Sequence, residues 1–326
     1  MIGIISVTEK GDVLARKLAK SLNGTLYLKT EIEDFKLSKL TEEAMQIHKG
    51  VIFISSTGIA VRAIAPYLKG KDKDPGVVVV DVSNNYTISL ISGHIGGAND
   101  LAINVSEILN NTPIITTATD NLGVVAPDVI AVKNSLVIED LKKAKTIASL
   151  LVKGEIIGFK DDKNLINTPS GYNEIKNLEE NSVWVTNKIS ANNNLDDKKI
   201  LRLIRKDIVL GIGCRRGIES ERLEDFVIKT LYDNNIDPKA VLKIGSIEIK
   251  KDEKAINDLK NKLECPFETF TKNEILKIHN KFEGSDFVEK TLGVRAICEP
   301  SVELMGGNII ISKIKFNGMT LSIGQV

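Results

Sequence analysis

Short apolar runs alternate with amphipathic segments along the first 120 residues. Residues 2–7, 51–55 and 77–82 are apolar runs of strand length, whereas residues 11–22 have apolar side chains near helical spacing. The same pattern predicts helices at 58–68 and 98–109 and strands at 87–91 and 114–117. The polar triplet 83–85 predicts a hairpin between two of the strands. The alternation indicates a doubly wound α/β domain.

Two further segments follow. Residues 121–206 are rich in Asn and Lys, with polar clusters at 161–164 and 192–194, a helical pattern at 136–151 and a strand at 183–186. From residue 207 the pattern alternates again, with strands at 208–212, 241–249, 309–314 and 320–323 and helices at 219–232 and 253–263. We therefore predict two α/β domains with mostly parallel sheets, residues 1–120 and 207–326. A smaller, irregular α/β domain, residues 121–206, joins them.

The charge balance limits the classes of partner. The chain has 326 residues, with 44 Lys or Arg and 43 Asp or Glu, so its formal net charge is +1. Such a chain has no field to steer nucleic acid or an anionic membrane, so anion recognition must be local. Its three cysteines define neither a disulfide framework nor paired metal-ligand spacing. With no signal peptide and no apolar span of ~18 residues, we expect a cytoplasmic protein without a metal site.

The segment 55–62, Ser-Ser-Thr-Gly-Ile-Ala-Val-Arg, ends a strand and begins a helix. Thr57 is the expected N-cap. Arg62 lies in the early turns, where the helix dipole disfavours a cation. An anionic ligand over the helix start would account for Arg62, and a carboxylate of the protein would account for it equally well.

Three glycines within five residues surround His94 in the segment 91–100, Ile-Ser-Gly-His-Ile-Gly-Gly-Ala-Asn-Asp. Gly96 and Gly97 leave backbone amides open near a helix start, where an anion can bind. A histidine, whose unperturbed pKa is about 6.5, can move protons near neutral pH. We favour a functional role for this loop; a tight strand-to-helix turn is the alternative.

Thr117 and Asp120 follow the next strand, in the segment Thr-Thr-Ala-Thr-Asp. Ligands of open α/β sheets bind at the carboxyl ends of strands, so we expect Thr57, the His94 loop and residues 117–120 to converge at one sheet edge. This arrangement requires residues 77–82 to be the reversed strand of the hairpin. A hydroxyl-rich turn capped by Asp120 is an equal alternative.

A second group of candidates lies near the carboxyl end of the chain. The glycine-rich segment 211–217 has the spacing G-x-G-x-x-x-G and no acidic residue ~20 positions on, unlike a dinucleotide loop. Arg215 and Arg216 suit carboxylates, which guanidinium groups bind with paired hydrogen bonds. Cys214 lies between the strand and these two arginines. It is either an activated thiol or, as we favour, a small residue in a tight turn.

Arg295 and Glu299 lie in the segment 293–301, an apolar, helix-like stretch. Glu299 is a candidate acid, although a carboxylate next to a proline is more often a helix cap. The chain lacks the G-x-x-x-x-G-K-[ST], G-x-S-x-G and H-E-x-x-H motifs, which removes support for three common hydrolase classes.

These segments resemble one known family over almost the whole chain. Residues 56–102 (STGIAVRAIAPYLKGKDKDPGVVVVDVSNNYTISLISGHIGGANDLA) and 112–120 (TPIITTATD) resemble the amino-terminal domain of the CbiG family of cobalt-precorrin-5A hydrolases. GIGCRRG, SIEIKKDE and VRAICEPS resemble its carboxy-terminal domain. The match is poorest in the middle, and the family's alanine-rich stretch after Glu299 reads Pro-Ser-Val-Glu-Leu here.

The resemblance implies a hydrolase of anaerobic cobalamin biosynthesis. Water would open the δ-lactone of cobalt-precorrin-5A, and acetaldehyde would leave to give cobalt-precorrin-5B. The cobalt belongs to the substrate, so no cofactor of the protein is expected. The acidic side arms of the corrin intermediate match the arginines in the resembling segments, namely Arg62, Arg215, Arg216 and Arg295.

Lactone hydrolysis requires a base, donors for the oxyanion and an acid for the departing oxygen. We expect His94 to be the base and the amides of Gly96 and Gly97 to be the donors. Asp120 or Glu299 would orient His94 or assist protonation. A non-catalytic corrinoid-binding module is one alternative, and a nucleotide-dependent enzyme that uses residues 211–217 is another. Contacts with neighbouring pathway enzymes are also compatible with the resemblance, which implies no particular oligomeric state.

Overall fold

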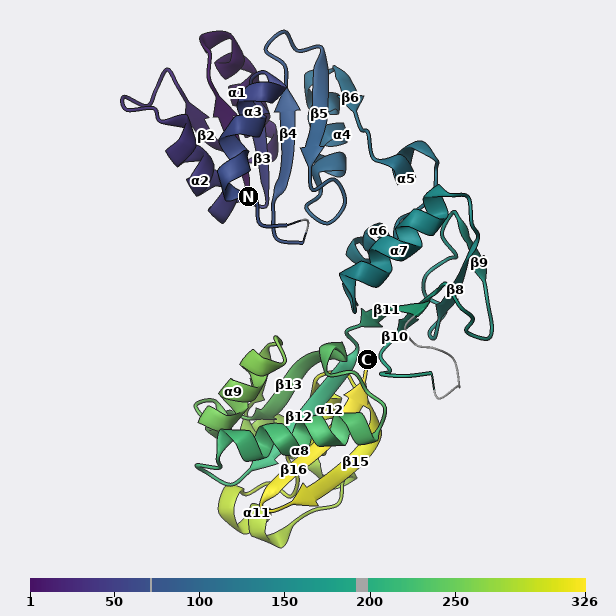
Figure 1. Cartoon of the computed structure of the whole chain (residues 1–326). Helices are drawn as coiled ribbons and strands as arrows, with labels where there is room; N and C mark the ends of the chain where they lie inside the picture. Colours follow the sequence, from purple (N-terminus) through teal and green to yellow (C-terminus); the bar gives the residue numbers. More distant parts are fainter. Residues whose placement is uncertain (71, 192–198) are drawn as a thin grey trace. The chain divides into compact units, whose positions relative to one another are not determined.

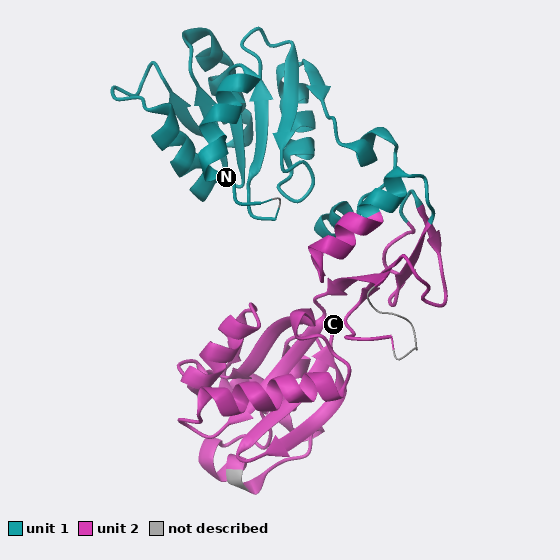
Figure 2. Cartoon of the chain, viewed as in Figure 1, with its two compact units in different colours: residues 1–133, 148–156, 169–171 teal, residues 134–147, 157–168, 172–326 magenta. Residues whose placement is uncertain are grey.

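The computed structural model describes residues 1–70, 72–191 and 199–326, and these form two compact units (Figures 1 and 2). Unit 1 comprises Met1–Lys133, Ala148–Ile156 and Pro169–Gly171. Unit 2 comprises Asn134–Ile147, Ile157–Thr168 and Tyr172–Val326. One mostly parallel sheet lies in unit 1 and two lie in unit 2, which confirms the predicted α/β class.

The domain boundaries at residues 120 and 206 stay predictions, and the polar cluster 192–194 lies outside the described residues. No helix in the described ranges is long and apolar enough to cross a bilayer.

Unit 1 is built on a six-stranded sheet with the order β2-β1-β3-β4-β5-β6. Its strands are β1 (Ile2–Ser6), β2 (Thr25–Leu28), β3 (Gly50–Ile54), β4 (Gly76–Val80), β5 (Tyr86–Ile91) and β6 (Thr112–Ile114). The first four run parallel, β5 is antiparallel to β4, and β6 is parallel to β5. β2 and the helix α2 (Leu37–Ile47) were not predicted, because β2 has only four residues and the apolar positions of α2 are interrupted by charged residues.

The reversed strand of the hairpin is β5, so the prediction that residues 77–82 are reversed is wrong. The helix α3 (Thr57–Ile64) connects β3 to β4, and a strand that follows a helical crossover returns parallel to the first. The predicted hairpin turn is confirmed at residues 81–85, and a tight turn reverses only the strand after it. The Asp81 carboxylate holds this turn by accepting hydrogen bonds from the backbone N–H groups of Ser83, Asn85 and Tyr86 at 2.6–3.0 Å.

This reversal separates two groups of candidate residues. Thr57 and Arg62 follow the carboxyl end of β3, whereas His94 follows the carboxyl end of β5, which lies beside the amino ends of β3 and β4. The predicted convergence of Thr57 with the His94 loop is therefore wrong. Since β6 is parallel to β5, residues 117–120 do emerge at the same sheet edge as His94.

Helices cover both faces of this sheet, as the labels of Figure 1 show. Alternate residues of β3 point to opposite faces: Ile52 and Ile54 lie in the core with α1 (Glu9–Leu22) and α4 (Ala98–Leu109), and Val51 and Phe53 lie in the core with α2 and α3. All four side chains are fully buried, and each such burial contributes about 1.5–3 kcal/mol. The short helices α5 (Ala118–Asn121) and α6 (Pro127–Lys133) complete the part of unit 1 that bears on the site.

The first sheet of unit 2 has five strands in the order β7-β11-β10-β8-β9. They are β7 (Leu136–Ile138), β8 (Ile157–Asp161), β9 (Tyr172–Glu174), β10 (Ser182–Thr186) and β11 (Ile200–Arg205). The predicted strand at 183–186 is confirmed, but the predicted helix at 136–151 is partly wrong. Its first residues form β7, and α7 (Leu141–Val152) begins only after Asp140, whose carboxylate accepts a 2.7 Å hydrogen bond from the Lys142 N–H.

The second sheet of unit 2 has the order β14-β13-β12-β16-β15. Its strands are β12 (Ile208–Cys214), β13 (Val241–Ile247), β14 (Phe267–Phe270), β15 (Asn308–Phe316) and β16 (Met319–Gln325). Its helices are α8 (Ser220–Asp233), α9 (Lys254–Lys262), α10 (Lys272–Leu276), α11 (Asp286–Leu292) and α12 (Cys298–Leu304). β12, β13 and β14 run parallel, so the loops after them open at one edge, where the β15–β16 turn also lies.

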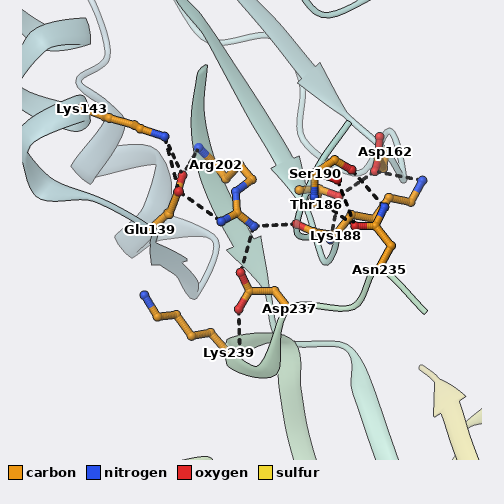
Figure 3. A network of polar contacts seen from close by, with 10 residues as sticks. All are labelled: Glu139, Lys143, Asp162, Thr186, Lys188, Ser190, Arg202, Asn235, Asp237 and Lys239. Carbon is orange, nitrogen blue, oxygen red and sulfur yellow. Dashed lines mark hydrogen bonds and ion pairs between the residues drawn. The ribbon is translucent and has the colours of Figure 1, made fainter. Parts of the chain in front are cut away.

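Charged side chains join the two sheets of unit 2 (Figure 3). The Arg202 guanidinium on β11 lies 3.1 Å from a Glu139 oxygen and donates to Asp237 at 2.8 Å and to the Lys188 carbonyl at 2.7 Å. Its side chain is only 15% exposed, and Asp237 also caps the turn before β13. Arg202 is partly buried and satisfies three partners at once, so it links β11 of one sheet to the turn before β13 of the other.

Candidate functional site

His94 lies between two carboxylates of unit 1. Its Nδ1 is 3.1 Å from Oδ1 of Asp128, on α6, and its Nε2 is 3.1 Å from Oδ2 of Asp120, on α5. The His94 side chain is 11% exposed, Asp128 is 23% exposed and Asp120 is 43% exposed. The structure thus brings together His94 and Asp120, as predicted, and adds Asp128.

Asn99 fixes the position of Asp120. It is buried in the first turn of α4, and its Nδ2 donates to Asp120 Oδ2 at 2.9 Å and to Thr117 Oγ1 at 3.1 Å. Its own Oδ1 accepts a 2.6 Å hydrogen bond from Ser89 on β5. Thr117 therefore contacts Asn99 and is the N-cap residue of α5, without a side-chain cap bond. We name His94, Asn99, Asp120 and Asp128 the histidine cluster.

The two carboxylates favour the protonated form of His94. A neutral imidazole has one N–H donor, and its other nitrogen would face a carboxylate oxygen that has no proton to give. The hydrogen bond with Asp128 raises the pKa of His94 above 6.5, although burial opposes this shift. Burial would raise the pKa of Asp128, but its hydrogen bond with His94 brings that pKa below the ordinary value. The surroundings thus favour protonated His94, and both of its nitrogens contact carboxylates, which argues against the predicted role as base.

The glycines of the His94 loop have unequal roles. The N–H of Gly97 donates to the His94 carbonyl at 3.0 Å, so it is not free to stabilise an oxyanion as predicted. Gly96 is required by close packing, because a Cβ there would lie 2.9 Å from the Asp74 carbonyl oxygen and from the Gly76 nitrogen. Gly97 has φ +77° and is the N-cap residue of α4. The tight-turn interpretation therefore accounts for both glycines.

Thr57 and Arg62 form no part of the histidine cluster. Ser56, not Thr57, is the N-cap residue of α3. The Arg62 guanidinium donates to the Gly58 carbonyl at 3.3 Å and pairs with none of the carboxylates in the described ranges. The alternative in which a carboxylate of the protein accounts for Arg62 therefore has no support among the described residues.

Unit 2 contains a large cavity at the sheet edge where β12 and β13 end. Its volume is about 1200 Å³, above the ~300–1,000 Å³ of ordinary small-molecule pockets. Apolar side chains form part of its lining, including Val288, Leu292 and the exposed Ile249 and Phe316. Seven cations also line it, namely Arg215, Arg216, Lys250, Lys254, Arg295, Lys313 and Lys315. We call it the cationic cavity; it contains all three arginines predicted for unit 2.

Two backbone hydrogen bonds hold the loop that carries Arg215 and Arg216. The Arg215 N–H donates to the Gly318 carbonyl at 3.0 Å, and the Gly217 N–H donates to the Glu253 carboxylate at 2.9 Å. Gly211 lies inside β12, where a Cβ would overlap the Cys298 carbonyl of α12. The first glycine of the segment 211–217 thus permits close helix packing and does not line a phosphate loop.

Glu299 lies on α12, buried, and does not line the cationic cavity. Its Oε1 accepts a 3.2 Å hydrogen bond from the Lys313 N–H, and its Oε2 is 4.0 Å from the Lys313 Nζ. These contacts tie α12 to β15 rather than offering an acid to a ligand. Cys214 lines the cavity, and burial raises its pKa to about 11, so the thiol is not activated and the small-residue interpretation is favoured.

Sequence reasoning missed several residues of both sites. Asn99 and Asp128 belong to the histidine cluster, and Lys250, Glu253 and Lys254 belong to the cationic cavity and its loop. One signal was readable for Asp128, which follows a proline at a helix start. No group of three or more His, Cys, Asp or Glu residues within the described ranges could hold a metal ion.

Three family models match the chain in series. They are described as Cobalamin synthesis G N-terminal, residues 39–120, Cobalamin biosynthesis central region, residues 125–203, and Cobalamin synthesis G C-terminus, residues 208–324. Together with the three α/β sheets, they define the class of the chain as an α/β protein of cobalamin synthesis.

Curated relatives narrow this class. The cobalt-precorrin-5A hydrolase of Salmonella typhimurium is 31% identical, over 99% of this chain and 97% of the relative, and that of Priestia megaterium is 28% identical, over 99% and 94%. A solved cobalamin biosynthesis protein G homologue from Sulfolobus solfataricus is 24% identical, over 99% of this chain and 96% of that one, with a TM-score of 0.41. The chain belongs to the cobalt-precorrin-5A hydrolase family.

Proposed function

We propose that this chain hydrolyses cobalt-precorrin-5A in cobalamin biosynthesis, releasing acetaldehyde and giving cobalt-precorrin-5B. The observation that carries the proposal is the cationic cavity, whose volume of about 1200 Å³ suits a large macrocycle. Its arginines and lysines complement the acetate and propionate arms of a corrin intermediate, and its apolar residues complement the ring. The cobalt is part of the substrate, so the protein supplies no metal ligand in this scheme.

The proposed reaction breaks two bonds. Water adds to the lactone carbonyl, the acyl C–O bond breaks, and the water oxygen remains in the new carboxylate. The freed oxygen becomes the aldehyde oxygen when the adjacent C–C bond breaks, and the electron pair of that bond passes to the macrocycle. The reaction therefore needs one group that removes a proton from water and one that protonates or stabilises the departing oxygen.

The histidine cluster offers a group for each task. Asp120 is the more exposed carboxylate, and Asn99 and His94 hold only its Oδ2, so Asp120 is the proposed base. Protonated His94, held by Asp128, is the proposed acid. This assignment replaces the expectation that His94 is the base, because both of its nitrogens contact carboxylates.

The decisive test is turnover of cobalt-precorrin-5A by the purified chain, measured as acetaldehyde with an NADH-linked alcohol dehydrogenase. We expect one acetaldehyde per substrate consumed. Asp120→Asn should slow release ~10²–10⁴-fold while corrin binding, followed by visible absorbance, persists. Binding without any release by the unmodified chain would refute the proposal and favour a corrinoid-binding module.

The proposal includes the cellular compartment in which the enzyme acts. All three cysteines are free, and burial raises the pKa of each to about 11. Such thiols are compatible with the reducing cytoplasm, where we propose that the enzyme meets its substrate.

A further inference from the structure

The seven cations of the cationic cavity fall into two groups by their pairing. Four face a carboxylate of the protein: Lys250 with Glu253 at 2.8 Å, Arg295 with Glu289 at 3.6 Å, Lys313 with Glu299 at 4.0 Å, and Lys315 with Glu283 at 3.5 Å. The other three, Arg215, Arg216 and Lys254, form no ion pair with any carboxylate in the described part of the chain. The carboxylates Asp252 and Glu253 also line the cavity, but no ion pair within the described ranges ties the second group to them, so its side chains can contact a ligand.

Lys254 occupies an unfavourable position for a cation. It is the first residue of the nine-residue helix α9, where the helix dipole is positive and stabilises anions. The preceding residue, Glu253, is the N-cap residue, but its side chain forms no cap hydrogen bond with the helix. The helix does not compensate the charge of Lys254, and Lys254 forms no ion pair within the described ranges, with Asp252 and Glu253 as the carboxylates next to it in the sequence.

Glu253 instead links α9 to the arginine loop. Its carboxylate is buried, accepts from the Gly217 N–H at 2.9 Å and pairs with Lys250 at 2.8 Å. Burial opposes its ionised form, but these contacts and the nearby Arg216 hold its pKa below the ordinary value. Glu253 thereby fixes the loop of Arg215 and Arg216 beside the start of α9, where Lys254 lies.

We propose that Lys254 binds a carboxylate of the substrate together with Arg215 and Arg216, and that this trio, rather than the four paired cations, recognises the acidic arms of the macrocycle. The proposal rests on the proposed function for the identity of the ligand. It assigns a binding residue that lies outside every glycine or arginine motif of the sequence. The paired cations position cavity walls through their own carboxylates.

Binding of a stable corrinoid to the full chain tests this assignment. The probe is dicyanocobyrinic acid, whose carboxylates are free, and its heptamethyl ester is the uncharged comparison. The variants are Lys254→Met and, on the same helix, Lys262→Met, because exposed Lys262 pairs with Glu224 at 3.2 Å and does not line the cavity. Isothermal titration gives the Kd of each variant for each probe.

We expect Lys254→Met to weaken binding of the acid about tenfold or more, as for loss of a charge-assisted contact, and to leave ester binding unchanged. Lys262→Met should bind both probes like the unmodified chain. Equal acid affinities for all three proteins, or equal weakening in both lysine variants, would overturn the assignment. Acetaldehyde release is measured separately, so loss of the proposed activity with an intact Lys254 effect would reject the reaction and retain the binding trio.

Discussion

Replacing Asp128 by Asn tests how the histidine cluster sets the charge of His94. Asp128 is the largest cause of the raised His94 pKa, through a hydrogen bond at 3.1 Å between side chains that are 11% and 23% exposed. An asparagine side chain carries no charge and offers the imidazole either a neutral oxygen or an N–H. We therefore expect the pKa of His94 to fall in Asp128→Asn.

The stability change has a defined pH window. Because the folded-state pKa of His94 is raised above 6.5, its contribution is complete below about pH 6.5 and is lost as the pH rises through the folded pKa. The folded-state pKa of Asp128 is lowered below 3.8, so its contribution is present above that value and is lost as the pH falls through the folded pKa. Hydrogen bonds to charged groups contribute about 1.5–3 kcal/mol, and Asp128→Asn should reduce the free energy of unfolding by that amount between these limits.

Proton NMR can follow the three histidines of the chain, His48, His94 and His279, through a pH titration, and urea unfolding at each pH gives the stability. Glu43→Gln is the control: burial holds the pKa of His48 below 6.5, Glu43 opposes that shift, and its replacement should lower the pKa of His48 further and move that resonance alone. An unchanged or higher His94 midpoint in Asp128→Asn would refute the reasoning. So would a stability loss that grows as the pH rises above the His94 midpoint.

Four further outcomes are expected. Arg216→Leu should raise KM about tenfold or more with an unchanged Tm, because an unpaired cation that binds substrate contributes about 1.5–3 kcal/mol; a lower Tm with the same KM would make it structural. Asp120→Asn should lower kcat ~10²–10⁴-fold, and near-normal kcat would exclude Asp120 as the base. Cys214 should resist iodoacetamide at neutral pH, because burial raises its pKa to about 11, and rapid alkylation by mass spectrometry would contradict this. Gly211→Ala should lower Tm, since its Cβ would overlap the Cys298 carbonyl, and an unchanged Tm would show that α12 can shift.

Much of the fold was predictable because periodicity and turn residues act locally. The strands and helices around residues 50–110 follow from their apolar patterns, as do β12, β13, β15, β16, α8 and α9 after residue 207. The short elements β14, α10 and α11 were not predicted. Strand direction was predicted wrongly for the β4–β5 pair, although the α3 crossover between β3 and β4 was itself visible in the sequence. The error came from requiring all candidate loops to share one sheet edge.

The site was predictable only in part, because its members act through partners distant in sequence. His94 and Asp120 stand out as residue types in glycine-rich or strand-end segments, and they do meet. The second carboxylate on His94, from Asp128, depends on how α6 packs, which no local pattern encodes. Lys254 belongs to none of the motifs in the sequence, and it is distinguished by its place in the cavity lining and by having no ion pair within the described ranges.

The β4–β5 turn sets the position of the histidine cluster at the far end of a strand. Asp81 holds the turn, and the six residues of β5 then carry the chain roughly 20 Å, at about 3.3 Å per residue, before the His94 loop begins. An insertion of one residue in the turn would slide β5 by one position and exchange its two faces, which would turn Ser89 away from Asn99. A loop remote from the histidine cluster thus serves as the spacer that aligns Ser89 with Asn99, so its length is constrained together with the identity of the residues in the cluster.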